Sequence, residues 1–214
     1  MDFCETIMEI CNSYRNFLPR VLFTFSTRGI PNRQNFRYWN TKNLHLSIPS
    51  RSQYRQTVNV WAGILGHRII GPYFIEGYLT GERYLQLLEE NVAVAVENLE
   101  LVDQHDGCPS NNSRQVKEYL DNTFPHHWIG RGGTINWPAR SPDLAPNDFV
   151  LWGHLKNKLY NNGQCYENKD LLKDAIIGEC GKISAYMLAN VRKEFYDRLG
   201  YCLAANGNLF EHLI

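Results

Sequence analysis

The run Thr57-Val58-Asn59-Val60-Trp61-Ala62-Gly63-Ile64-Leu65 carries an apolar or small side chain at every second position from Val58 to Ile64. This period of two predicts a β-strand with one buried face. A turn at Gly66-His67 leads into a further predicted strand, Arg68 to Ile75. Upstream, Val21 to Phe25 and Phe36 to Trp39 also have strand composition. The first third of the chain is therefore predicted to be a β-meander with short turns.

Helical patterns flank these strands. Apolar residues recur at intervals of three and four residues over residues 5–18 and 81–96, which predicts two helices. Residues 99–104 predict a strand, and Asn112-x-x-Gln115 is a capping box for the next helix. Residues 138–146 form a proline-marked extended connection. The remaining predicted helices cover residues 148–160, 168–181 and 184–200. This order of elements predicts an α/β or α+β domain with one central mixed sheet.

The composition is that of a globular protein. The chain has 214 residues, of which 43% are hydrophobic and 21% charged, which excludes disordered and collagen-like chains. Its apolar runs are too short to span a bilayer, and no signal segment opens it. The six cysteines are scattered without a C-x-x-C pair, so free thiols are expected rather than a disulfide framework or a zinc site. These features predict a soluble, intracellular protein.

The formal net charge of zero conceals an uneven distribution. No Asp or Glu occurs from Ile10 to Ile75, whereas that stretch contains nine Lys and Arg residues. Aromatic residues lie among these bases, a mixture that suits phosphate contacts and base stacking. The alternative is a solvated sheet edge protected by Arg and Lys. The predicted nucleic-acid-binding residues are Arg28, Arg33, Arg37, Lys42, Arg51, Arg55 and Arg131. Arg131 lies in a Gly-rich run that either cradles a phosphate or forms a plain turn.

Asp106 and Asp148 are the candidate catalytic and metal-binding residues. Asp106 directly follows a predicted strand, where an acid points into a crevice at the sheet edge, although Asp-Gly is also a common turn pair. Asp148 opens a helix and shares a stripe with Trp152 and Leu155, which predicts an inward-pointing carboxylate. The alternative for Asp148 is a first-turn acid favoured by the helix dipole. Two converging carboxylates would suit Mg²⁺ or Mn²⁺ in phosphodiester chemistry, which normally needs a third acid.

Several stretches resemble the catalytic domain of mariner-type DNA transposases, members of the DDE endonuclease superfamily. They are Val58–Gly63, Ile70–Phe74, Gln104–Pro109, Trp128–Gly133, Trp137–Asp148 and Asn206–Leu213. The resemblance covers nearly the whole chain, and the block that ends at Asp148 is highly specific. It implies a single catalytic-type domain over residues 1–214, with a core at about 20–160, C-terminal helices at about 168–205 and a ribonuclease H-like fold with helices on both faces of a mixed sheet.

The same resemblance implies a three-acid, two-metal site that cleaves transposon ends and transfers strands. Asp106 matches the second acid and Asp148 the third, whereas Asp143 belongs to the motif without being a metal ligand. The family places its first acid in a run like Phe-Thr-Asp-Glu, but this chain has Phe23-Thr24-Phe25-Ser26. An in-frame loss of about four residues accounts for the difference, and an even number preserves the side-chain alternation of the strand.

Two further departures accompany the missing acid. Asn111 stands where the family usually has His, and the helix-turn-helix region that reads transposon ends is not found before the catalytic domain. We therefore expect a transposase-derived nucleic-acid-binding domain whose catalysis is impaired. The alternative is an active DNA-cleaving fragment, if another acid completes the site or the gap is an error of gene prediction. The expected partners are DNA, Mg²⁺ or Mn²⁺ and a second copy of the chain, and the expected location is the nucleus.

Overall fold

A five-stranded mixed sheet forms the centre of the molecule. The computed structural model describes residues 3–13, 16–27, 56–97, 99, 101–105, 113–137, 144–208 and 210. The strands are β1 (Asn16–Ser26), β2 (Thr57–Leu65), β3 (Arg68–Ile75), β4 (Leu101–His105) and β5 (Trp128–Ile129). Their order is β3-β2-β1-β4-β5. β2 is antiparallel to both β1 and β3, whereas β4 is parallel to β1 and to β5. The predicted central mixed sheet is confirmed.

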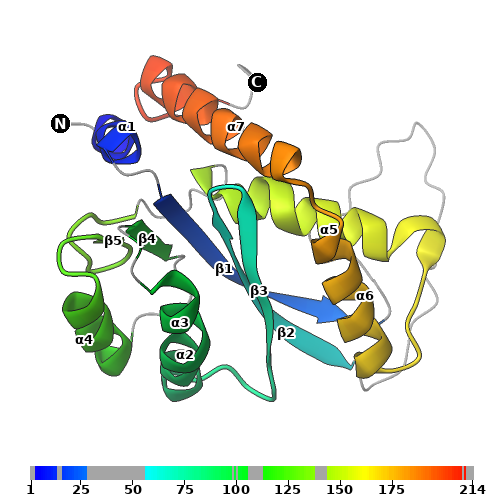
Figure 1. Cartoon of the computed structure of the whole chain (residues 1–214). Coiled ribbons are helices and arrows are strands. Elements are labelled where there is room, and N and C mark those ends of the chain that lie inside the picture. The colour runs from blue at the N-terminus through cyan, green and yellow to red at the C-terminus, as the bar shows by residue number, and fades with distance from the viewer. Residues whose placement is uncertain are drawn as a thin grey trace, which may run out of the picture.

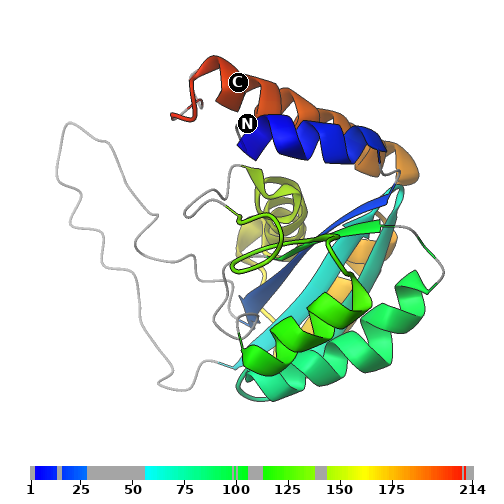
Figure 2. The same cartoon turned by 90° about the vertical axis from the view of Figure 1, so that its left-hand side faces the viewer.

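Helices cover both faces of this sheet, as predicted (Figure 1). The α-helices are α1 (Phe3–Ser13), α2 (Gly81–Leu87), α3 (Ala93–Val96), α4 (Arg114–Thr123), α5 (Trp152–Leu159), α6 (Lys169–Gly181) and α7 (Ala185–Ala204). One face carries α5 and α6, and the other carries α2, α3 and α4. Helices α1 and α7 lie side by side beyond the sheet (Figure 2). No helix of the described residues is both long enough and apolar enough to cross a membrane.

The alternation of β2 explains why this strand lies inside the sheet. Val58, Val60, Ala62 and Ile64 are all buried in the core beneath α5 and α6. Trp61 and Leu65 point to the opposite face and pack in the core beneath α2. Because successive side chains of a strand point to opposite faces, one apolar run can fill two cores at once. The predicted strands at residues 57–65 and 68–75 are confirmed at both ends.

Several predicted boundaries were wrong, among them the start of the first strand, predicted at Val21 and found at Asn16. The helix predicted over residues 5–18 ends at Ser13, and Asn16 already belongs to β1. Pairing decides this boundary, because Asn16 lies beside Leu101 in the parallel ladder with β4. The strand predicted over residues 99–104 spans Leu101–His105. Helix α4 is capped by Ser113, whose hydroxyl accepts from the Val116 N–H at 3.4 Å, rather than by Asn112.

The helix predicted over residues 81–96 is confirmed, but a π-helical turn, η2 (Leu88–Val92), interrupts it between α2 and α3. A second π-helical turn, η5 (Asn147–Leu151), precedes α5, and a short 3₁₀ turn, η6 (Asn161–Gly163), follows it. The helices predicted over residues 168–181 and 184–200 correspond to α6 and α7. The strand predicted at Phe36 to Trp39 and residues 138–143 of the predicted connection lie outside the described residues.

Candidate active site and nucleic-acid interface

Asn147 is the polar residue that η5 directs onto the sheet. It is fully buried, and its Nδ2 donates to the carbonyl oxygens of Pro19 in β1, at 3.2 Å, and Ala62 in β2, at 3.0 Å. Ala62 lies at a register shift between β2 and β3, where the ladder is irregular. The Asn147 amide therefore joins the start of the α5 segment to the two central strands. Reasoning from sequence had passed over this residue.

The π-helical turn explains why Asn147, and not Asp148, faces the sheet. In an α-helix, Asp148 would lie one turn before buried Trp152 and on the same stripe, which was the basis for predicting an inward carboxylate. A π-helix bonds residue i to i+5, so the position that shares the inner face with Trp152 is Asn147. Asp148 is exposed. The side chain is thus not sealed in the core, and the metal-binding role of Asp148 stays a prediction.

The carboxyl group of Asp148 is nevertheless partly surrounded by protein and lies near Lys156. Partial desolvation raises the pKa of the Asp148 carboxyl, and the nearby Lys156 ammonium opposes that rise. Desolvation likewise lowers the pKa of Lys156, while Asp148 opposes it. Because Asp148 reaches solvent, we interpret it as a carboxylate at the rim of the protein rather than one sealed inside. The Lys156 Nζ also lies 4.2 Å from the centre of the Phe23 ring, a cation–π contact.

Three aromatic rings fill the space between β1 and α5. Phe23 and Phe25 point to the same face of β1, and their ring centroids are 4.9 Å apart. Trp152 stacks on Phe23 at 5.5 Å and meets Phe25 edge-on at 5.8 Å. Both Phe25 and Trp152 are 1% exposed. Phe25 occupies the position after Thr24 where the resemblance places the first acid, so an apolar cluster stands there instead of a carboxylate.

Polar groups gather where β4 ends. Gln104 and Asn147 both lie next to Pro19, and both are fully buried. The two amide atoms of Gln104 and the Oδ1 of Asn147 have no hydrogen-bond partner among the described residues. Asp106, the second predicted acid, follows β4 in the sequence and lies outside those residues. Within the described part of the chain, no group of three His, Cys, Asp or Glu side chains could hold a metal ion.

The donor set expected for two divalent ions is therefore not assembled from the described residues. Asp148 is the one predicted ligand that they include, and the residue after Thr24, where the resemblance places the first acid, is the buried Phe25. An aromatic ring donates no oxygen to Mg²⁺ or Mn²⁺, which prefer carboxylate ligands. By themselves, the described residues include one of the predicted acids, because Asp106 lies outside them.

The two ends of the basic segment between β1 and β2, Thr27 and Gln56, lie side by side and form a neck. The Thr27 N–H donates to the carbonyl of Gln56 at 3.1 Å, so the two ends of the segment meet. The Tyr160 hydroxyl donates to the Ser26 carbonyl at 2.6 Å, and the Tyr166 N–H donates to the Thr27 carbonyl at 2.7 Å. Burial raises the pKa of Tyr160 to about 12, so its hydroxyl remains a donor at neutral pH.

Of the seven predicted nucleic-acid-binding residues, Arg131 alone is described, and it is exposed. The others, Arg28, Arg33, Arg37, Lys42, Arg51 and Arg55, lie between the two ends of the neck and outside the described residues.

The Gly-rich run around Arg131 is a turn with internal hydrogen bonds. The Gly130 N–H donates to Ile135 O, the Gly132 N–H to Asn136 Oδ1 and the Gly133 N–H to Gly130 O. These amides are therefore not directed at a ligand, which favours the plain-turn interpretation over a phosphate cradle. Gly133 is required by packing, because a Cβ there would lie 2.8 Å from the Trp128 ring.

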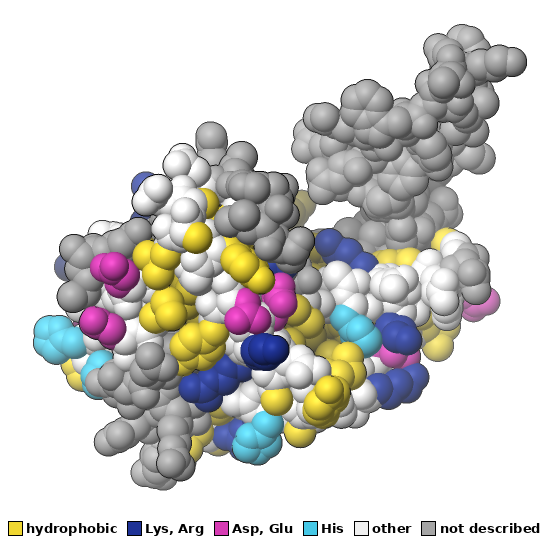
Figure 3. Space-filling view, turned by 90° about the horizontal axis from the view of Figure 1, so that it is seen from above, with side chains coloured by type: hydrophobic (Ala, Val, Ile, Leu, Met, Phe, Trp, Pro, Cys, Tyr) yellow, Lys and Arg dark blue, Asp and Glu magenta, His cyan; other side chains and the backbone are white. Residues whose placement is uncertain are grey.

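Charges of both signs mix on the face seen from above in Figure 1. Lys, Arg, Asp and Glu side chains of the described residues alternate there with hydrophobic ones (Figure 3). Such a surface creates no strong field of one sign. The described residues of this face therefore do not form a basic nucleic-acid interface.

The chain is similar in sequence to the Tc3 transposase of Caenorhabditis elegans, at 24% identity over 175 residues. This alignment covers 80% of the chain and 51% of Tc3, so the chain spans about half the length of the curated relative. No protein-family model matches the chain.

Solved structures of Mos1 mariner transposase have the same fold. The paired-end complex with Mn superposes with a TM-score of 0.75 at 18% identity, covering 98% of this chain and 62% of that one. The isolated catalytic domain with Raltegravir and Mg gives a TM-score of 0.67 at 16% identity, covering 98% of this chain and 94% of that one. The match to an isolated catalytic domain over nearly its whole length confirms the predicted ribonuclease H-like fold.

Proposed function

We propose that this chain, which has the fold of the mariner transposase catalytic domain, is a transposase-derived DNA-binding domain whose metal-dependent cleavage is impaired. The observation that carries the proposal is Phe25. The first strand is continuous through this position, since Phe25 pairs with Val58, and the phenyl ring packs in the core where the family has a carboxylate. Loss of that acid removes a ligand that positions both ions, and each of those ions stabilises charge in phosphodiester cleavage.

DNA is the proposed partner, and two independent observations support it: the basic composition of one segment and the DNA complexes of proteins with the same fold. The stretch from Ile10 to Ile75 contains nine Lys and Arg residues and no Asp or Glu. Most of these basic residues lie in the segment between Thr27 and Gln56, whose backbones are hydrogen-bonded to each other at the neck. The Mos1 structures of the same fold include a paired-end complex with a left transposon end and a strand transfer complex. Binding through phosphate contacts does not need the metal site, so it would survive the loss of the first acid.

We further propose that the chain binds Mg²⁺ or Mn²⁺, pairs with a second copy of itself and is located in the nucleus. Mos1 structures were solved with Mg and with Mn, which supports a divalent ion for the fold. In this chain, Asp106 and Asp148 would hold such an ion, and it would supply charge stabilisation of the scissile phosphate. Without a third acid, we expect weak binding of one ion at most.

Restoring the acid tests the proposal. A four-residue insertion that begins Asp-Glu, placed between Thr24 and Phe25, keeps the strand alternation and returns a carboxylate to the position. The measurement is nicking of supercoiled plasmid with Mg²⁺ or Mn²⁺. We expect duplex binding but no nicking by the natural chain, and nicking by the insertion variant. The matched insertion that begins Asn-Gln has the same length without the charge and is expected to stay inactive.

The alternative, an active DNA-cleaving fragment, makes the opposite prediction for the natural chain. Metal-dependent nicking that disappears in Asp148→Asn would establish it and overturn the proposal of impairment. Sequencing of the transcript across codons 20–30 separates the remaining possibility, because an error of gene prediction would reveal additional codons after Thr24.

A further inference from the structure

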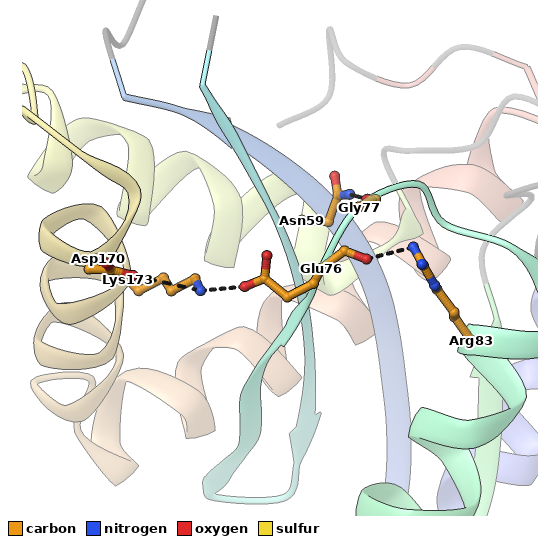
Figure 4. A network of polar contacts seen from close by, with 6 residues as sticks. All are labelled: Asn59, Glu76, Gly77, Arg83, Asp170 and Lys173. Atoms are coloured by element: carbon orange, nitrogen blue, oxygen red, sulfur yellow. Dashed lines mark hydrogen bonds and ion pairs between the residues drawn. The ribbon is translucent and has the colours of Figure 1, made fainter.

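The three-residue turn Glu76-Gly77-Tyr78 is held by side chains from separate elements. Arg83 of α2 donates from Nη1 to the carbonyl of Glu76 at 2.7 Å and to that of Tyr78 at 2.9 Å. Asn59 of β2 donates from Nδ2 to the carbonyl of Gly77 at 2.8 Å. All three carbonyls of the turn are thereby bound by side chains. Figure 4 shows the contacts to the Glu76 and Gly77 carbonyls.

Further contacts fix the side chains that hold the turn. The Thr24 hydroxyl donates to Asn59 Oδ1 at 2.7 Å, which orients the Asn59 amide. Lys173 of α6 pairs with the Glu76 carboxylate, and this contact lowers the pKa of Glu76 (Figure 4). Gly77 has a φ of +73°, and a Cβ there would lie 2.6 Å from Arg83 Nη1. The turn is thus a preorganised structure that requires glycine at its centre.

This rigid turn presents an aromatic side chain to solvent. Tyr78 is 90% exposed, the largest exposed fraction among the large hydrophobic residues described. An exposed ring contributes little to folding, because it removes almost no apolar surface from water. A ring on a fixed backbone is well suited to binding, because little conformational entropy remains to be lost when a ligand packs on it.

A polar cavity of about 290 Å³ lies at this turn. Tyr78 lines it together with Thr57, Asn59, Lys169 and Lys173, among others. Glu76 also lines the cavity and is paired with Lys173. Lys169 forms no ion pair with the residues that the structure describes, although its charge contributes to the lowered pKa of Glu76. Thr57 directly follows Gln56, so the cavity adjoins the neck of the basic β1–β2 segment.

We infer that Tyr78 and Lys169 form a site for an unpaired nucleotide of single-stranded DNA. The Tyr78 ring stacks on the base, and the Lys169 ammonium contacts the phosphate next to it. Aromatic stacking combined with a cation is the usual way in which proteins bind unpaired nucleotides without sequence preference. In a duplex each base is already stacked between its neighbours, so the ring favours single strands. The inference rests on the proposed DNA-binding function and specifies which form of DNA this site takes.

Binding of a fluorescent oligo(dT) and of a duplex of equal length tests the site in the full chain. We expect Tyr78→Ala to weaken oligo(dT) binding by about 5- to 150-fold, the range of stacking on one base, and to leave duplex binding unchanged. Tyr78→Phe keeps the ring and is expected to bind like the natural chain. Tyr186→Ala is the matched control, because Tyr186 is 75% exposed at the start of α7.

Two further readouts separate stacking from charge. An oligonucleotide that contains 2-aminopurine is quenched when its base stacks, and we expect this quenching with the natural chain and with Lys169→Gln, but not with Tyr78→Ala. We expect Lys169→Gln to reduce the slope of log affinity against log salt by about 0.7 for single strands. Unchanged oligo(dT) affinity in Tyr78→Ala, with duplex binding intact, overturns this inference alone and makes a protein contact the better role for Tyr78. If the natural chain binds neither oligo(dT) nor duplex DNA, both the proposed function and this inference are overturned.

Discussion

Replacing Asn147 by Leu tests whether its amide joins the α5 segment to the central strands. Leu has nearly the same shape, so the substitution creates little cavity and removes mainly the hydrogen-bonding groups. The two lost bonds run from Nδ2 to the carbonyls of Pro19 and Ala62, at 3.2 and 3.0 Å. Asn147 is fully buried, and water cannot easily replace the lost donor.

The expected cost follows from these two bonds. A typical intramolecular hydrogen bond contributes about 1 kcal/mol net, and a buried carbonyl left without its partner costs about 1–3 kcal/mol. Because both carbonyls lose the same donor, we expect the free energy of unfolding to fall by about 2–4 kcal/mol. In a chain of this size, that corresponds to a decrease in Tm of roughly 5–15 °C.

Urea and thermal unfolding followed by far-UV circular dichroism measure this effect. The control is Asn190→Leu, the same chemical change at an exposed position of α7, where we expect a change within about 0.5 kcal/mol. If Asn147→Leu is as stable as the control, the Asn147 amide does not fasten the α5 segment to β1 and β2, and the inferred role of its two hydrogen bonds is refuted.

Three further substitutions test the packing and charge around the site. Trp152→Ala removes the ring on which Phe23 stacks, and we expect it to lower the free energy of unfolding by about 3–5 kcal/mol in urea titrations. Gly133→Ala places a methyl group against Trp128, and a loss of about 1–3 kcal/mol is expected, seen as a lower Tm. Lys156→Met removes the cation that opposes the raised pKa of Asp148, so this pKa should rise further in an NMR titration. Because the folded-state pKa lies above the unfolded value, ionisation of Asp148 costs stability as pH rises through that interval, and costs more in the variant.

Local patterns predicted the interior of the elements well. The alternation in β2 predicted the strand because every second side chain is buried in one core along its length. Apolar residues at intervals of three and four predicted the helix over residues 81–96, whose buried side chains share one core. Boundaries were less predictable where a distant partner decides them. The helix predicted over residues 5–18 stops at Ser13, because Asn16 pairs with Leu101, a residue far along the chain.

The candidate site shows the same division. Asp148 was predicted as a site residue from its motif and its place at the start of a helix, but its exposure to solvent was not predicted. The direction depends on a π-helical turn, in which one extra residue per turn moves Asn147 to the inner face. Asn147 belongs to the same motif, Trp137–Asp148. It lies five residues before Trp152, a spacing that places two residues on one face of a π-helix but was not considered when an α-helix was assumed. Asp106 and most of the basic residues remain predictions.

The sequence by itself determined the fold class, the order of elements and the absence of an acid after Thr24, because periodicity, motif and residue identity are local properties of a chain. Only the tertiary structure decided how the residue after Thr24 is packed: Phe25 lies against Phe23 and Trp152, which are brought together by the contact of β1 with the α5 segment. It also decided that Tyr78 is an exposed ring on a rigid turn, since Asn59, Arg83 and Lys173 come from three elements. Such convergence depends on long-range packing, which no single stretch of sequence contains.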